Sequence, residues 1–163
     1  ENNDMHLGPQ NIMVFHDLEK AEAYAKEVHK PLFVDFTGHA CVNCRKMEEK
    51  VWGEPGILEI LRDKMVIVSL YVDEKTALPA SEHKELEYTP GKKMKITQVG
   101  HKWSYLQTTR YKSNTQPYYR LLGPTNEDLD IGSADYEHHG NAADFKAWLE
   151  KGLLEYSKAE GNK

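Results

Sequence analysis

Residues 31–49, PLFVDFTGHACVNCRKMEE, decide the fold and contain the only two cysteines of the chain, Cys41 and Cys44. The apolar run 32–36 predicts a buried strand, and the charged run after Cys44 favours a helix. A strand, a short loop and a helix that opens with Cys-x-x-Cys suit a redox-active pair of thiols. We therefore expect the chemistry of this protein to centre on Cys41 and Cys44.

The elements on either side of this stretch predict a βαβ unit. Residues 65–72, MVIVSLYV, are β-branched and almost wholly apolar, so they predict a strand buried on both faces. Two strands joined by a helix are expected to be parallel, with a right-handed crossover. Upstream, residues 11–15 predict a short strand, and Asp17 is a good N-cap for an amphipathic helix over about 17–29.

The rest of the chain completes an alternating pattern. Residues 1–10 predict a loose lead-in, and residues 74–98, rich in charges, predict an irregular surface insertion. The other expected elements are a helical turn or two at 57–62, a helix at 99–110, a strand at 118–122, an antiparallel strand within 129–134 and a final helix from Asn141. The order β-α-β-α-β-α-β-β-α predicts an α/β fold with a central mixed sheet flanked by helices on both faces.

The composition predicts one globular domain, residues 1–163. Hydrophobic residues make up 39% and charged residues 29% of the chain, which argues against a disordered protein. The net charge of -5 argues against a nucleic-acid-binding protein, because such proteins usually present a basic patch. No apolar run approaches the roughly 18 residues of a membrane span. Because the chain starts at Glu1 rather than Met, we expect a processed protein or a domain excised from a larger one.

A metal site built on the two cysteines is the alternative to redox chemistry. A structural zinc site needs four ligands, and no second cysteine or histidine pair has a matching spacing. A c-type haem needs histidine after the second cysteine, where this chain has Arg45. We therefore expect no metal, and keep as the alternative a module in which Cys41, Cys44 and a histidine hold copper(I) or zinc.

The position of the two cysteines in the predicted helix assigns them different roles. At a helix N-terminus, unpaired N–H groups and the helix dipole favour a thiolate, the nucleophile in disulfide exchange. We therefore expect Cys41 to attack a partner's disulfide. Cys44 lies one turn further into the helix, more buried, and is expected to resolve the mixed disulfide by attacking Cys41.

From about residue 12 to residue 156, the chain resembles the thioredoxin superfamily. Asp35 lies six residues before Cys41, as in the family pattern V-D-F-x-x-x-x-C-x-x-C. Arg110-Tyr111 followed by Gln116-Pro117 is similar to the approach to the family's cis-proline. The resemblance therefore implies a thioredoxin-like fold in which Pro117 is cis and lies against the dithiol.

Within the superfamily, the chain is most similar to the C-terminal thioredoxin-like domain of the thiol:disulfide interchange protein DsbD. The similarity rests on Lys30-Pro31, on Asp35 and on the run C-V-x-C-[KR]-x-x-E, here residues 41–48. Two features differ from relatives: Ala40 stands where many have tryptophan, and the insertion at 74–98 makes this region longer than in a minimal thioredoxin. Both differences lie where partners would dock.

Two carboxylates are candidates for handling the proton of Cys44. Asp35 interrupts an apolar strand, so its pKa should be raised, and the resemblance implies proton exchange with the resolving thiol. The alternative for Asp35 is a solvent-facing acid or a structural hydrogen-bond acceptor. Glu48 lies four residues after Cys44, on the same helix face, and the alternative is an ordinary solvated charge.

Four residues are candidates for contact with a partner: Gln116, Pro117, Ala40 and His39. The resemblance implies that the neighbours of Pro117 offer backbone groups to an incoming peptide. His39, two residues before Cys41, would stabilise a thiolate when protonated, although a loop histidine is more often merely exposed.

The resemblance implies a protein-disulfide reductase that receives electrons from a transmembrane donor domain and passes them to partner proteins of the cell envelope. Such partners include other thioredoxin-fold proteins and factors of cytochrome c maturation. The expected location is the periplasm, tethered to the inner membrane through the parent protein, and the isolated domain is expected to be a monomer. No cofactor is implied beyond the Cys41–Cys44 disulfide. The alternatives are the metal-handling module and a binding or chaperone-like module in which the thiols are incidental.

Overall fold

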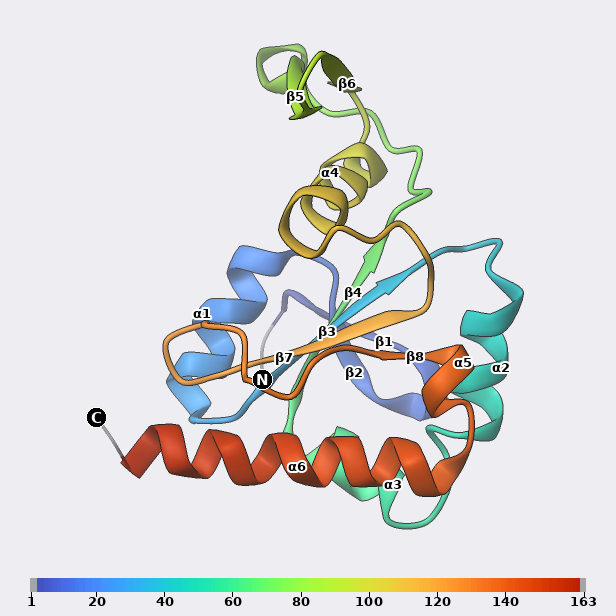
Figure 1. The fold of residues 1–163 in the computed structure, drawn as a ribbon, viewed down its shortest axis with the longest axis vertical. Coiled ribbons are helices and arrows are strands. Elements are labelled where there is room, and N and C mark those ends of the chain that lie inside the picture. The colour runs from blue at the N-terminus through green and yellow to red at the C-terminus, as the bar shows by residue number, and fades with distance from the viewer. Residues whose placement is uncertain (1–2, 162–163) are drawn as a thin grey trace.

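The computed structural model describes residues 3–161, which form a six-stranded mixed sheet with helices on both faces (Figure 1). The strands lie in the order β1-β2-β4-β3-β7-β8. Their bounds are β1 Met5–Leu7, β2 Met13–Phe15, β3 Leu32–Thr37, β4 Val66–Tyr71, β7 Tyr118–Leu122 and β8 Ala134–Asp135. The helices are α1 Leu18–Val28, α2 Val42–Lys50, α3 Ile57–Glu59, α4 Val99–Tyr111, α5 Tyr136–His139 and α6 Ala142–Gly161. The predicted α/β fold class is confirmed.

The predicted βαβ unit forms the centre of the sheet. β3 and β4 pair in parallel from Leu32 opposite Val66 to Thr37 opposite Tyr71, and α2 lies between them in the chain. β7 pairs antiparallel with the other edge of β3. Every residue of β3 is buried, which explains why its sequence is a nearly continuous apolar run.

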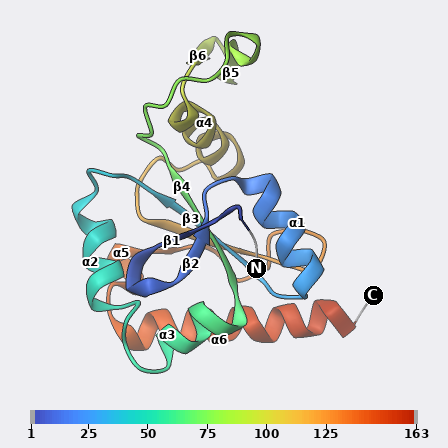
Figure 2. The ribbon, with the colours of Figure 1, turned by 180° about the vertical axis from the view of Figure 1, so that it is seen from behind.

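Two apolar clusters hold the helices against the two faces of the sheet (Figures 1 and 2). Alternate residues of β3 point to opposite faces, so Phe33 joins one cluster and Phe36 the other. The Phe33 cluster includes residues of α2, α3 and α6, and the Phe36 cluster includes residues of α1 and α4. The ring of Phe33 lies 4.8–6.2 Å from those of Tyr119, Trp52, Phe145 and Trp148. These contacts hold the sheet against the helices of the Phe33 cluster, which include α2, the helix that begins at the cysteines.

The N-cap predicted at Asp17 is confirmed, and its removal should weaken the fold. Oδ1 of Asp17 accepts a hydrogen bond from the backbone N–H of Lys20 at 3.1 Å. We expect Asp17→Ala to lower the free energy of unfolding by about 1 kcal/mol, because an alanine leaves that donor without a partner. Urea unfolding followed by circular dichroism measures this. Glu27→Ala, on the exposed side of α1, is the matched control, and an equal loss in both variants would contradict the capping role.

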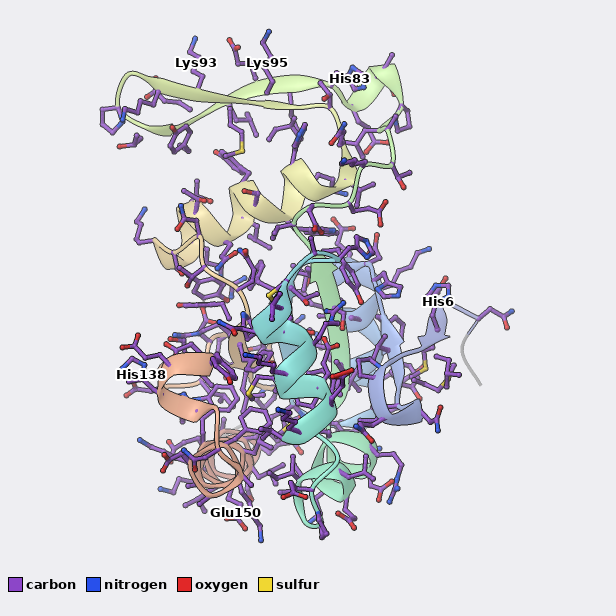
Figure 3. All side chains as sticks on the ribbon, turned by 90° about the vertical axis from the view of Figure 1, so that its right-hand side faces the viewer. His6, His83, Lys93, Lys95, His138 and Glu150 are labelled. Carbon is purple, nitrogen blue, oxygen red and sulfur yellow. A yellow bond between two sulfur atoms is a disulfide. The ribbon has the colours of Figure 1, made fainter. Side chains whose placement is uncertain are left out.

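The insertion is regular, contrary to the prediction for residues 74–98. β5 (Lys84–Thr89) and β6 (Lys92–Ile96) form a separate two-stranded antiparallel sheet that packs on α4. Leu86 lies opposite Met94 on one face, whereas on the other Glu85 lies opposite Lys95 and Glu87 opposite Lys93. Figure 3 shows Lys93 and Lys95 pointing away from α4. Charged and apolar residues alternate along both strands, which is the period-two pattern of a half-buried strand, but the many charges and the prolines of this region led to the prediction of an irregular insertion.

Two smaller predictions were also wrong. Residues 5–7 are not part of a loose lead-in, because β1 pairs antiparallel with β2 and makes the edge of the sheet. The strand expected within 129–134 is instead β8, Ala134–Asp135, which is too short to give a pattern of its own. It does pair antiparallel with β7, as expected, and runs directly into α5.

Across residues 3–161, no helix has the length and hydropathy needed to cross a bilayer.

Candidate active site

Cys41 and Cys44 form a disulfide at the start of α2, with their Cα atoms 5.3 Å apart. Cys41 is the N-cap residue, and its Sγ accepts a hydrogen bond from the backbone N–H of Cys44 at 3.1 Å. Cys41 is partly exposed, whereas Cys44 is 1% exposed. A thiolate on Cys41 would therefore meet both a backbone donor and the positive end of the helix dipole, and only Cys41 is within reach of a partner.

Asp35 is a buried carboxyl group, so the solvent-facing alternative for this residue is wrong. It is 1% exposed, and Oδ2 accepts a hydrogen bond from Oγ of Ser69 at 3.1 Å. Burial raises the pKa of Asp35 well above its usual value, and the nearby Glu48 carboxylate raises it further. The Ser69 hydrogen bond and the Arg45 charge oppose this effect only in part. Asp35 can therefore hold a proton at a higher pH than an exposed aspartate can.

Glu48 lies on the buried face of α2, so the reading as a solvated helix charge is also wrong. It is 7% exposed, and Arg45 binds it with two nitrogens: Nη2 lies 3.0 Å from Oε2 and Nε lies 2.9 Å from Oε1. Burial raises the pKa of Glu48, and Arg45 opposes this through its charge and hydrogen bond. The structure thus brings Asp35 of β3 close to Glu48, which lies on the same helix as Cys44.

Arg45 and Ser69 belong to this site although the sequence did not single them out. Arg45 also donates a hydrogen bond to Oγ1 of Thr37 at 3.1 Å, so its guanidinium joins α2 to the end of β3. The spacing of Arg45 and Glu48, three residues apart on a helix, is a signal that could have paired them. Ser69 is a polar residue in an apolar strand, like Asp35, and parallel pairing sets the two directly opposite.

The loop before Cys41 is fixed by contacts with residues 71–74. The carboxylate of Asp73 accepts hydrogen bonds from the backbone N–H groups of His39 and Ala40, at 2.8 and 3.1 Å. The ring of His39 stacks on that of Tyr71 with centroids 4.0 Å apart, and its Nε2 lies 2.9 Å from Oε1 of Glu74. Hydrogen bonds from Thr76 and then from His39 lower the pKa of Glu74 to about 2. His39 is therefore engaged with its own chain, and Ala40 is exposed beside the disulfide.

The segment containing Gln116 and Pro117 faces the Cys-x-x-Cys loop. The Gln116–Pro117 peptide bond is cis, the isomer that the resemblance implied. Nε2 of Gln116 donates to Oε1 of the buried Gln107 at 2.8 Å, and Nε2 of Gln107 donates to the carbonyl of Thr115 at 2.8 Å. Gln116 and Pro117 line the same cavity of about 390 Å³ as Asn43, which lies between the two cysteines. Gln116 and Pro117 thus lie near Asn43 of the Cys-x-x-Cys loop, whereas Ala40 and His39 directly precede Cys41 in the chain.

Within the described part of the chain, no group of three or more His, Cys, Asp or Glu side chains is arranged to hold a metal ion. The nearest loop histidine, His39, is occupied by Tyr71 and Glu74.

Comparisons with known proteins agree on the fold. A family model described as thioredoxin-like matches residues 12–91. No curated protein matches the sequence.

The solved structures that resemble most of this chain include the following three. A thioredoxin from Thermus thermophilus has a TM-score of 0.61 and 18% identity, with 90% of this chain and 92% of that chain covered. A DsbH oxidoreductase has a TM-score of 0.60 and 16% identity, with 94% of each chain covered. A disulphide isomerase from Xylella fastidiosa Temecula1 has a TM-score of 0.52 and 14% identity, with 82% and 86% covered. At these identities the likeness is one of fold.

Proposed function

The chain has a thioredoxin-like fold with a Cys41–Cys44 disulfide at a helix N-terminus, and from this premise we propose that it is a thiol–disulfide oxidoreductase. The observation that carries the proposal is the pairing of a partly exposed Cys41, at the N-cap of α2, with a buried Cys44. Disulfide exchange needs one accessible thiolate and one thiol that reacts only after the partner is bound.

In the proposed reaction, the reduced chain passes two electrons to a partner's disulfide. The Cys41 thiolate attacks one partner sulfur, a mixed disulfide forms, and the other partner sulfur leaves as a thiolate that takes up a proton. Cys44 then loses its proton and attacks Sγ of Cys41. The bond from Cys41 to the partner breaks, the Cys41–Cys44 bond forms, and the partner leaves with both sulfurs reduced.

We propose that Asp35 accepts the proton of Cys44 and that Glu48 assists by raising the pKa of Asp35. The raised pKa of Asp35 makes its carboxylate a stronger base than that of an exposed aspartate, which suits a general base. Glu48 contributes by raising the pKa of Asp35, and Arg45 keeps the pair of carboxylates from becoming too costly to bury. The Asp73 contacts with residues 39 and 40 hold the attacking loop in place.

The finer proposal is that this domain works in net reduction in a cell envelope. Its support is the similarity of residues 30–48 to the C-terminal domain of DsbD, together with the fold shared with a DsbH oxidoreductase. The donor would then be a transmembrane domain and the recipients would be envelope proteins. A redox potential nearer the thioredoxin value of roughly -270 mV than the DsbA value of roughly -120 mV would support net reduction.

The function is tested by mixing the reduced protein with an uncharged small disulfide, bis(2-hydroxyethyl) disulfide. We expect Cys41 and Cys44 to become oxidised while two molecules of mercaptoethanol appear for each chain. The rate of this exchange should exceed that of free cysteine at equal thiol concentration. Thiol alkylation and mass spectrometry measure both changes. A dithiol that exchanges no faster than free cysteine would contradict the proposal.

A further inference from the structure

The cavity beside the disulfide is lined in part by residues 135–137, which have no role in the exchange reaction proposed above. One side is Asn43 and a second is the segment 115–117, whereas the third is formed by Asp135, Tyr136 and Glu137. β8 leads directly into α5, and α5 packs against α2, so this third wall is held rigidly beside the redox loop (Figure 1).

This wall makes the cavity acidic. Two carboxylates line it, those of Asp135 and Glu137, and no lysine or arginine does. Oδ1 of Asp135 caps α5 through the N–H of His138 at 2.7 Å and lies 2.9 Å from the His138 ring. Glu137 is exposed and has no hydrogen bond or ion pair within residues 3–161. Together with Asp135, its charge raises the pKa of the neighbouring His138, and its carboxylate remains open to a side chain that enters the cavity.

The third wall also has an apolar part of suitable shape. Tyr136 and Pro117 both line the cavity, which at about 390 Å³ is large enough for one long side chain and part of a backbone. Lysine and arginine bury their methylene stems along apolar surface while their charged ends reach polar groups. Such a side chain could lie along Tyr136 with its cation at the two carboxylates.

The geometry points to this wall as a specificity site: the cavity selects partner disulfides whose cysteine is followed or preceded by a lysine or arginine. The inference rests on the proposed oxidoreductase function and names its substrate class. The basic residue enters the cavity while its cysteine meets Cys41, and the exchange then follows the two steps given above. Glu137 acts as a positioning residue, since it attracts the partner and takes no part in bond breaking.

The test uses two synthetic peptides, each closed by one intramolecular disulfide and identical except for lysine or glutamate beside one cysteine. The reduced protein is mixed with each, and kcat/KM for peptide reduction is measured while an external reductant regenerates the dithiol. At an ionic strength of about 0.01 M, we expect the lysine peptide to be reduced about five to ten times faster, mainly through KM. In about 1 M salt the ratio should fall toward one, because charges are then screened within about 3 Å.

Variants locate the effect. Glu137→Gln should reduce the lysine-to-glutamate ratio, and Glu137→Lys should invert it, whereas Glu150→Lys on α6 (Figure 3) should leave it unchanged. Asp135 is left intact because it caps α5. Equal rates for the two peptides, or a ratio that Glu137→Lys does not change, would overturn the inference and leave the oxidoreductase function standing. If neither peptide is reduced, both the inference and the proposed function fail.

Discussion

Replacing Cys41 with serine is expected to abolish disulfide exchange, with a loss of at least about three orders of magnitude in rate. A hydroxyl group is not ionised at neutral pH and does not attack a disulfide, and the buried Cys44 cannot reach a partner in its place. The fold should survive, because serine is also a favoured N-cap and its Oγ can accept the Cys44 N–H in place of Sγ.

The complementary variant, Cys44→Ser, is expected to attack but not to release. Mixed disulfides through Cys41 should accumulate, visible as species that a reductant removes on non-reducing gels. Cys41→Ser provides the matched control and should capture nothing. Capture through Cys44 in the Cys41→Ser variant would show that the two roles are reversed.

The second large effect is expected from Asp35→Asn, which should slow the release step by about a hundredfold near neutral pH. Asparagine keeps the size of the side chain and can still accept the Ser69 hydrogen bond, but it cannot take the proton of Cys44. Stopped-flow measurement of mixed-disulfide decay, from pH 5 to 9, separates this step from attack by Cys41. The wild-type profile should contain an inflection due to Asp35 that the variant lacks.

The same substitution should change stability with a defined sign. Burial raises the pKa of Asp35 in the folded chain, so between the unfolded and folded pKa values the folded state holds a proton that the unfolded state has lost. Wild-type stability therefore falls as the pH rises through this window and stays lower above it. Asp35→Asn should remove that fall and be more stable at high pH by roughly 1–3 kcal/mol.

A surface control separates these effects from general charge removal. Asp130 is exposed, and Asp130→Asn should change neither release nor the pH dependence of stability. If Asp35→Asn behaved like this control across the pH range, Asp35 would be excluded as the base.

Local signals explain why the centre of the site could be predicted from the sequence. Cys-x-x-Cys at a helix start, an acid in an apolar strand and the spacing of Glu48 from Cys44 are all patterns within a few residues. The burial of Asp35 and Glu48 follows from them, since one lies in a central strand and the other on the inner face of α2.

Other parts of the site depend on contacts between distant segments. The side chain of Arg45 turns inward to Glu48 and Thr37, a choice that depends on how α2 sits against β3. The acidic wall requires α5, which is a single turn and has no hydrophobic period to reveal it. The hairpin β5–β6 was missed although lysine and glutamate alternate with its apolar residues and Pro90-Gly91 marks its turn, because the number of charges in this region suggested an irregular surface segment.

The hairpin β5–β6 is a separate two-stranded sheet whose length can vary without a change in the central sheet. Its strands bond to each other and share no ladder with the central sheet, and its two ends meet where Leu78 donates to the carbonyl of Thr97 at 2.9 Å. A lineage could change the length of the hairpin beyond this junction while the cysteines, Asp35 and Glu48 keep their places, whereas loss of the whole hairpin would uncover α4 and remove the buried Ile96. Descendants with different hairpins could then acquire new clients while they inherit the same chemistry.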